Sequence, residues 1–295
     1  MRLMRDDGPT LTPALRVTML RALGHAEPDA SVRCGDHLAQ RFLDDETRML
    51  LRMRRAMLNR FEATAPGLYG YVVARTRFFD EVVARSVDAG VRQFVLIGAG
   101  YDSRAWRFDA PASLTFYEVD TPDVHRAKAE RAAAAALAAP ANRIVPIDPQ
   151  PDAGSLVARL EAAGVDWTAP FTVMAEGVLY YLDPAFLEGL LYALRARRAP
   201  AGACVAFDYL DGAVLVNPAG YYGGEQVKLM ERDEGVTFRF CASRDAIRDR
   251  CAAAGLVVTH DHDAAEIERR FLTRTDGTEA GRAVGGFHLC CAQFE

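Results

Sequence analysis

The chain has 295 residues, half of them hydrophobic and a quarter charged, so it is long enough for one large domain with a sizeable core. Its net charge of −5, with Lys at only two positions, argues against the broad basic face that nucleic-acid binding requires. No apolar run approaches the roughly 20 residues that span a bilayer, and the first residues hold no stretch of signal-peptide length, so we expect a soluble cytoplasmic protein without a membrane partner.

The first ninety residues predict helices. Thr12-Pro13 is typical of an N-cap followed by proline at the first helical position, in a helix that ends near residue 24. An amphipathic stripe predicts a second helix over 45–61, and a third is expected over 71–89, with a glycine after its end. We expect residues 1–70 to form a helical extension that either packs against a sheet or covers a ligand mouth as a lid.

From Phe94 onward the pattern changes to alternating strands and helices, which predicts an α/β fold with a doubly wound, mostly parallel sheet covered on both faces. The last strand follows a long connection and is expected to be an antiparallel edge strand. Strands are predicted at 94–97, 114–119, 143–147, 171–175, 203–209, 256–260 and 287–294, and helices near 122–138, 154–163, 184–198 and 243–254.

A long connection separates the strand at 203–209 from the helix at 243–254. Long insertions in compact domains are usually functional loops or lids. We therefore expect residues 210–242 to enclose a substrate, as an insertion within a main domain over 71–295. The six cysteines form no CxxC pair and predict buried free thiols.

The segment QFVLIGAGYDSRAWR, over 93–107, is the most informative of the chain. An apolar strand breaks into Gly98-Ala99-Gly100, and a second strand ends at Asp120. In open α/β sheets such glycines let the backbone approach a ligand, and an acid about 20 residues later accepts hydrogen bonds from ribose hydroxyls. Ser103 stands where a dinucleotide fingerprint has its third glycine, so a nucleoside cofactor without a pyrophosphate is favoured.

Four segments together resemble the leucine carboxyl methyltransferase family of S-adenosylmethionine-dependent enzymes, which includes bacterial O-methyltransferases of secondary metabolism. The resemblance covers roughly residues 70 to 295, while the first seventy residues match no motif. The segments are ARTRFFD from Ala74, GAGYDSRAWRF from Gly98, FYEVD ending at Asp120 and EGVLYYL from Glu176.

The resemblance implies a role for individual residues in binding S-adenosylmethionine. Arg75 would meet the carboxylate of its methionine part, and Glu176 would lie near the methionine moiety and the reacting methyl. Asp148 would lie near the adenine amino group, although this chain has Pro149 where the family often has Leu. The full implied set is Arg75, Gly98, Ala99, Gly100, Asp120, Asp148 and Glu176.

Candidates for the acceptor side follow strand ends or lie in the long insertion. No histidine stands out as a catalytic base, and Arg104 and Arg107 are expected to brace neighbouring carboxylates. The run over 260–263, His-Asp-His-Asp, is interpreted as a solvated turn, and no metal site is expected because adjacent strand residues face opposite ways. The candidates are Tyr180, Tyr181, Tyr209, Tyr221, Tyr222 and Arg239.

The sequence thus predicts an S-adenosylmethionine-dependent O-methyltransferase acting on a small-molecule carboxylate or acidic hydroxyl, in secondary metabolism. Two alternatives remain: a protein of this fold that binds the cofactor without methyl transfer, and a methyltransferase of a peptide or protein C-terminal carboxylate. A nicotinamide-dependent oxidoreductase is disfavoured, because the third glycine and a Tyr-xxx-Lys pair are absent. The acceptor and the oligomeric state are not predicted.

Overall fold

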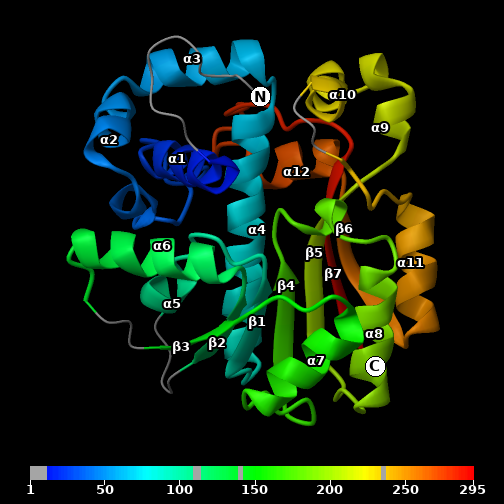
Figure 1. Ribbon diagram of the computed structural model, residues 1–295. Helices are drawn as coiled ribbons and strands as arrows, with labels where there is room; N and C mark the ends of the chain where they lie inside the picture. The colour runs from blue at the N-terminus through cyan, green and yellow to red at the C-terminus, as the bar shows by residue number, and fades with distance from the viewer. Residues whose placement is uncertain (1–11, 109–113, 139–141, 234–236) are drawn as a thin grey trace.

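The computed structural model describes residues 12–108, 114–138, 142–233 and 237–295, which form a seven-stranded sheet with helices on both faces (Figure 1). The strand order is β3-β2-β1-β4-β5-β7-β6, and only the pairs made by β7 are antiparallel among these described strands. The strands are β1 (Gln93–Ile97), β2 (Thr115–Val119), β3 (Arg143–Ile147), β4 (Phe171–Ala175), β5 (Cys204–Leu210), β6 (Leu256–His262) and β7 (Phe287–Phe294).

The predicted fold class is therefore confirmed. Strand β7 is antiparallel as expected, but the prediction that it is the edge strand is wrong, because it lies between β5 and the outermost strand β6. One face of the sheet packs on α7 (Ala153–Ala162), α8 (Phe186–Ala196) and α11 (Arg244–Ala253), and the other on α4 (Leu68–Asp88) and α12 (Ala264–Phe271). Both faces are covered, which explains why β4 and β5 are buried along their whole length.

The N-terminal region is helical, but one expected helix is broken. The helix α1 (Pro13–His25) begins as predicted, with the Thr12 hydroxyl accepting from the Leu15 amide. The stripe over 45–61 forms two helices, α2 (Asp45–Leu51) and α3 (Arg54–Thr64). The break turns Arg54 toward the end of α1, where it donates to the Leu23 carbonyl and pairs with Glu27. These tertiary contacts outweigh the helical periodicity.

Helix α4 runs through the centre of the molecule and contacts both the N-terminal helices and the sheet. Most of its residues are buried, including Arg75. Figure 1 shows α1, α2 and α3 at one end of the molecule, beside the upper end of α4, with the insertion on the other side of that end. The short helices α5 (Arg104–Arg107) and α6 (Pro122–Ala134) follow β1 and β2. Helix α6 ends four residues earlier than predicted.

The insertion over 210–242 is largely helical rather than an open loop. It contains α9 (Ala213–Val216), the 3-10 turn η3 (Pro218–Gly220) and α10 (Gly224–Asp233), and residues 234–236 lie outside the described chain. The Tyr222 hydroxyl bonds Glu62, and the Tyr222 carbonyl accepts from the Gly285 amide. The insertion is thus docked on the N-terminal helices and on the loop before β7.

The interpretation of residues 260–263 as a solvated turn is wrong. Strand β6 continues to His262, and Asp263 is the N-cap of α12, in a reciprocal capping box with Glu266. The Asp261 carboxylate is almost fully buried, where it accepts from the Tyr209 hydroxyl at 3.0 Å. No helix in the described ranges has the length and apolar character needed to cross a membrane.

Candidate functional site

The turn after β1 brings the backbone to the carboxyl edge of the sheet. Gly98 and Gly100 both have left-handed backbone angles, with φ of 70° and 50°, which favour glycine. A Cβ atom on Gly98 would lie 2.8 Å from the Val178 side chain. The amides of Gly98 and Ala99 donate to the Val119 carbonyl, so the turn is fixed to the end of β2. Conformation therefore favours glycine at both positions, and the contact with Val178 also restricts the space at Gly98.

Asp120 follows β2 and faces the same turn. Its Oδ2 accepts from the Gly100 amide at 2.8 Å, and its Oδ1 accepts from the Thr121 amide. An ionised carboxylate has about four acceptor positions, so Asp120 can still accept from a ligand hydroxyl. The predicted glycine turn and its acid therefore form one unit.

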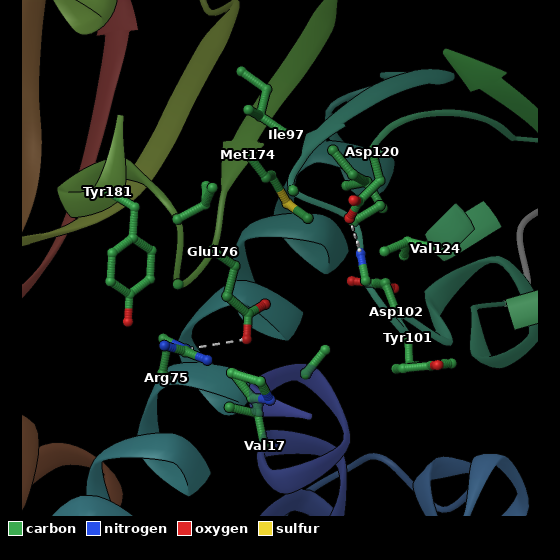
Figure 2. Close-up of a pocket in the computed structure, with 18 of the residues that line it drawn as sticks. Val17, Arg75, Ile97, Tyr101, Asp102, Asp120, Val124, Met174, Glu176 and Tyr181 are labelled. Carbon is green, nitrogen blue, oxygen red and sulfur yellow. Dashed lines mark hydrogen bonds and ion pairs between the residues drawn. The ribbon is translucent and has the colours of Figure 1, made fainter. Parts of the chain in front are cut away.

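These residues line a cavity of about 360 Å³ at the carboxyl ends of β1, β2 and β4. Figure 2 shows Asp120 at one end of the cavity, and Arg75, Glu176 and Tyr181 at the other. Six of the seven residues implied by the resemblance are on its wall: Arg75, Gly98, Ala99, Gly100, Asp120 and Glu176. The seventh, Asp148, follows β3 with an exposed side chain and is not among the lining residues.

Arg75 and Glu176 meet at the end of the cavity away from Asp120. Arg75 Nε donates to Glu176 Oε1 at 3.3 Å, and its Nη1 pairs with Asp208 Oδ2 at 3.2 Å. Burial disfavours the charge of Arg75, but these carboxylates, Asp208 foremost, raise its pKa above the ordinary value. The guanidinium is therefore a fixed cation.

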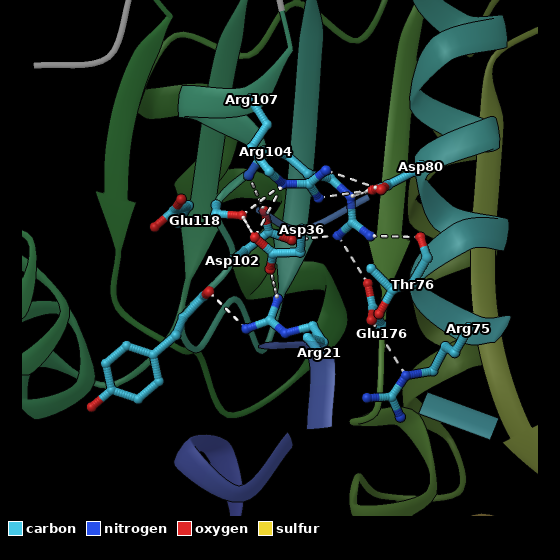
Figure 3. Close-up of polar contacts among 12 residues, drawn as sticks. Arg21, Asp36, Arg75, Thr76, Asp80, Asp102, Arg104, Arg107, Glu118 and Glu176 are labelled. Carbon is cyan, nitrogen blue, oxygen red and sulfur yellow. Dashed lines mark hydrogen bonds and ion pairs between the residues drawn. The ribbon is translucent and has the colours of Figure 1, made fainter. Parts of the chain in front are cut away.

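Arg104, which also lines the cavity, continues this chain of ion pairs through Glu176 (Figure 3). It is completely buried, and its Nη1 donates to Glu176 Oε2 at 2.9 Å while its Nε donates to Asp80. It also pairs with Asp102, and Arg107 pairs with Asp80. Both arginines brace carboxylates as the sequence predicts.

Asp102 shows how strongly this environment favours ionised carboxylates. Burial alone would raise the pKa of Asp102, but the charges of Arg104 and Lys128 lower it to about 2. Asp208 behaves differently, because its complete burial raises the pKa more than the neighbouring Arg75 lowers it. The network therefore contains carboxylates whose pKa values shift in opposite directions.

The N-terminal helix α1 forms part of the cavity wall, through Pro13, Ala14, Val17 and Arg21. Arg21 is buried, pairs with Asp36 at 3.2 Å and donates to the Tyr101 carbonyl at 2.9 Å. The sequence patterns did not identify α1 or Asp208 as parts of the site, since neither lies in a matching motif. Through α1, part of the extension predicted over 1–70 lies on the cavity wall.

The structure divides the acceptor-side candidates. Tyr180 and Tyr181, in the 3-10 turn η2 (Leu179–Tyr181), line the cavity, and the Tyr181 ring stacks on Phe238. Tyr209 is completely buried on the opposite face of the sheet, against His288 and Asp261, which removes it from the cavity.

The remaining candidates lie outside the lining residues. They are Tyr221 and Tyr222 in the insertion and Arg239, which forms an exposed pair with Asp183. Within the described ranges, no group of three His, Cys, Asp or Glu side chains is arranged to hold a metal ion. All six cysteines are free thiols, and five of them are buried.

Comparison with known sequences identifies relatives. The family model described as leucine carboxyl methyltransferase matches residues 14–194. A protein of Mycolicibacterium gilvum named "Putative S-adenosyl-L-methionine-dependent methyltransferase" is 35% identical over 219 residues, covering 70% of this chain and 68% of that protein. One of the same name from Mycobacterium avium is 38% identical over 144 residues, covering 48% and 46%. With most of these relatives, the match spans about half of the relative's length.

Comparison with solved structures supports the fold. A DUF574 family protein from Streptomyces avermitilis has a TM-score of 0.59 at 13% identity, with 95% of this chain and 97% of that chain covered. A structure from Thermobifida fusca, titled a putative methyltransferase, has a TM-score of 0.56 at 14% identity, with 93% and 97% covered. At these identities the likeness shows a shared fold.

Proposed function

The chain belongs to the leucine carboxyl methyltransferase family, and from this premise we propose that it transfers a methyl group from S-adenosylmethionine to an oxygen of a small-molecule acceptor. The observation that carries this proposal is that Arg75, the Gly98–Gly100 turn, Asp120 and Glu176 all line one cavity. The proposal places the reaction in the cytoplasm, in secondary metabolism. Six free cysteines are consistent with a reducing compartment.

The residues that line the cavity suit the chemical groups of this cofactor. The glycine turn allows close approach to the backbone, and Asp120 has acceptor positions for ribose hydroxyls. Arg75 uses Nε and Nη1 for protein carboxylates, so its Nη2 is the nitrogen left for the carboxylate of the methionine part.

The charge of the site favours a cationic donor. The ion-pair network around the cavity joins four arginines with five carboxylates, and Asp120 adds a further negative charge. When bound, the cofactor would supply a sulfonium-activated methyl group, whose positive charge the excess of carboxylates stabilises. Because these carboxylates outnumber the buried arginines, the site does not repel a cation.

The described lining residues provide no general base. They include no histidine, the carboxylates of Glu176 and Asp102 are paired with arginines, and Asp120 is the residue that we assign to the ribose hydroxyls. Burial and the charge of Asp208 raise the pKa of Tyr180 well above its ordinary value, so its hydroxyl remains protonated. An acceptor at this site therefore has to arrive ionised, as a carboxylate or an acidic phenol or enol does.

The chain's remaining contribution is to orient the acceptor and exclude water. Ala14 and Val17 of α1 give the cavity an apolar wall, and Tyr180 and Tyr181 give it aromatic surface. These surfaces would hold an anionic acceptor oxygen beside the methyl group that the cofactor supplies, so that the methyl would pass to oxygen and the carbon–sulfur electron pair would stay with the departing sulfur. Much of the acceleration comes from this alignment, because an oriented pair reacts as one molecule.

Calorimetry with S-adenosylhomocysteine tests the cofactor part of the proposal. The intact chain is expected to bind one molecule, and absence of binding would refute the proposal. A labelled-methyl assay with carboxylic acids, phenols and C-terminal peptides then tests the acceptor. Transfer to an acid or acidic phenol, with a rate that rises through the acceptor's own pKa, supports a base-free small-molecule reaction. Binding without any transfer, or transfer to peptides alone, would contradict it.

A further inference from the structure

Asp208 is a buried carboxylate directly behind the cavity wall. It lies near the end of β5, and its side chain is fully shielded from solvent. The contact with Arg75 joins residues 133 positions apart in the sequence. Removing a carboxylate from water is unfavourable unless several donors satisfy it, so its partners indicate what it holds in place.

Three donors surround Asp208. Its Oδ1 accepts from the Gly177 amide at 2.6 Å. Its Oδ2 accepts from the Tyr71 hydroxyl at 2.5 Å and from Arg75 Nη1 at 3.2 Å. Two of these partners, Arg75 and Gly177, line the cavity, and Tyr71 lies behind them. One carboxylate thus fixes two parts of the cavity wall that come from different elements.

Gly177 and Arg75 are also in direct contact. Gly177 has a φ of 72°, and a Cβ atom there would lie 2.8 Å from Arg75 Nη1. The turn after β4 and the guanidinium therefore have to be placed together. With Nη1 on Asp208 and Nε on Glu176, the plane of the guanidinium is set, and Nη2 is its remaining nitrogen.

We propose that Asp208 is a positioning residue that orients Arg75 and the Gly177 turn for the amino-acid end of the cofactor. This inference rests on the proposed function. It predicts a selective effect. Substitution of Asp208 should lower the affinity for ligands that carry the amino-acid part and should have little effect on the affinity for ligands that carry only the nucleoside.

Calorimetry on the full chain tests this selectivity with two ligands. S-Adenosylhomocysteine carries the amino-acid part, whereas 5′-methylthioadenosine shares the thionucleoside and lacks that part. Asp208→Asn is expected to weaken the binding of S-adenosylhomocysteine about tenfold or more. This loss corresponds to the usual contribution of a hydrogen bond to a charged group. Binding of 5′-methylthioadenosine is expected to change less than about threefold. Equal weakening of both ligands would overturn the proposal, because a general disturbance of the cavity predicts it.

Asp261→Asn is the matched control. Asp261 is also a buried carboxylate that accepts from a buried tyrosine on β5, but it lies outside the cavity. Its replacement is expected to leave both affinities unchanged. Loss of S-adenosylhomocysteine affinity in this variant equal to that in Asp208→Asn would overturn the assignment.

Two further variants keep the test decisive. Tyr71→Phe removes one donor to Asp208 and is suited to the case in which Asp208→Asn does not fold. It is expected to weaken the binding of S-adenosylhomocysteine selectively, and an equal loss of affinity for both ligands would contradict the inference.

In an Arg75→Ala background, Asp208→Asn should cause little further loss of affinity, since Asp208 acts through Arg75. Full additivity of the two losses would overturn the proposal. A wild-type chain that binds neither ligand would instead refute the proposed function.

Discussion

Each face of β5 has a buried hydrogen bond between a tyrosine and a carboxylate, but only one of these two pairs is connected to the cavity. On one face the Asp208 carboxylate accepts from the Tyr71 hydroxyl, and on the other the Tyr209 hydroxyl donates to the Asp261 carboxylate. Asp208 also holds Arg75 and Gly177, which line the cavity, whereas none of the second pair's partners does so. A buried polar network therefore does not by itself identify a site; its connection to a cavity does.

The largest expected difference between the faces concerns their arginines. Arg75→Ala leaves the buried Asp208 without its cation, although Glu176 keeps its pair with Arg104, and breaking a buried pair in this way costs about 3–5 kcal/mol. It should also weaken the binding of S-adenosylhomocysteine by about 100-fold. Denaturant unfolding and calorimetry measure the two effects.

Arg244→Ala is the corresponding change on the other face. Arg244 is partly exposed and pairs with Asp261, Asp263 and Glu266. Its loss should cost less unfolding free energy than Arg75→Ala, because Arg244 is partly exposed and Asp261 keeps its contacts with Tyr209 and His288, and it should leave ligand affinity unchanged. Equal effects of the two substitutions would remove the distinction between the faces.

Acid should destabilise the cavity network through Asp102. The pKa of about 2 in the folded chain lies below the ordinary value of 3.8. The stability that Asp102 contributes is therefore complete above about pH 4 and is lost as the pH falls toward 2, with a total of about 2 kcal/mol. In urea unfolding, Asp102→Asn should flatten the decline of stability between pH 4 and pH 2. An unchanged slope would contradict this assignment.

The two tyrosines provide the closest matched test. Tyr71→Phe and Tyr209→Phe each remove one hydroxyl that donates to a buried carboxylate, and each should cost about 1–3 kcal/mol of unfolding free energy. Only Tyr71→Phe is expected to weaken S-adenosylhomocysteine. The two variants should unfold at similar temperatures but differ in their affinity for S-adenosylhomocysteine, as measured by calorimetry. A loss of affinity in Tyr209→Phe would contradict the comparison.

The smallest effect is expected at Arg239, within the insertion. Arg239 pairs with Asp183, and both side chains are more than half exposed. Arg239→Ala should change the unfolding free energy by less than about 0.5 kcal/mol and leave cofactor affinity unaltered. A large loss of affinity in calorimetry would show that the insertion participates in cofactor binding.

The sequence predicts the strands and the glycine turn well because these depend on local patterns. Apolar runs place the strands, and Gly98, Gly100 and Asp120 lie within the single unit formed by β1, α5 and β2. Arg75 and Glu176 were identified through motifs, and the structure brings them together on the cavity wall.

Contacts between distant segments could not be predicted in the same way. Asp208 and Tyr209 are neighbours at the end of β5, and with both faces of the sheet covered, nothing local indicates which face meets the cavity. Sequence reasoning chose Tyr209, but the cavity lies on the side of Asp208. The break between α2 and α3 likewise depends on contacts between Arg54 and α1.

Titration with S-adenosylhomocysteine tests the central claim most directly, when the intact chain, Arg75→Ala and Asp261→Asn are compared. The structure predicts binding of one molecule by the intact chain, near-complete loss in Arg75→Ala and unchanged affinity in Asp261→Asn. No binding by the intact chain, or the same affinity in all three proteins, would contradict the claim that this cavity and its buried ion pairs form the cofactor site.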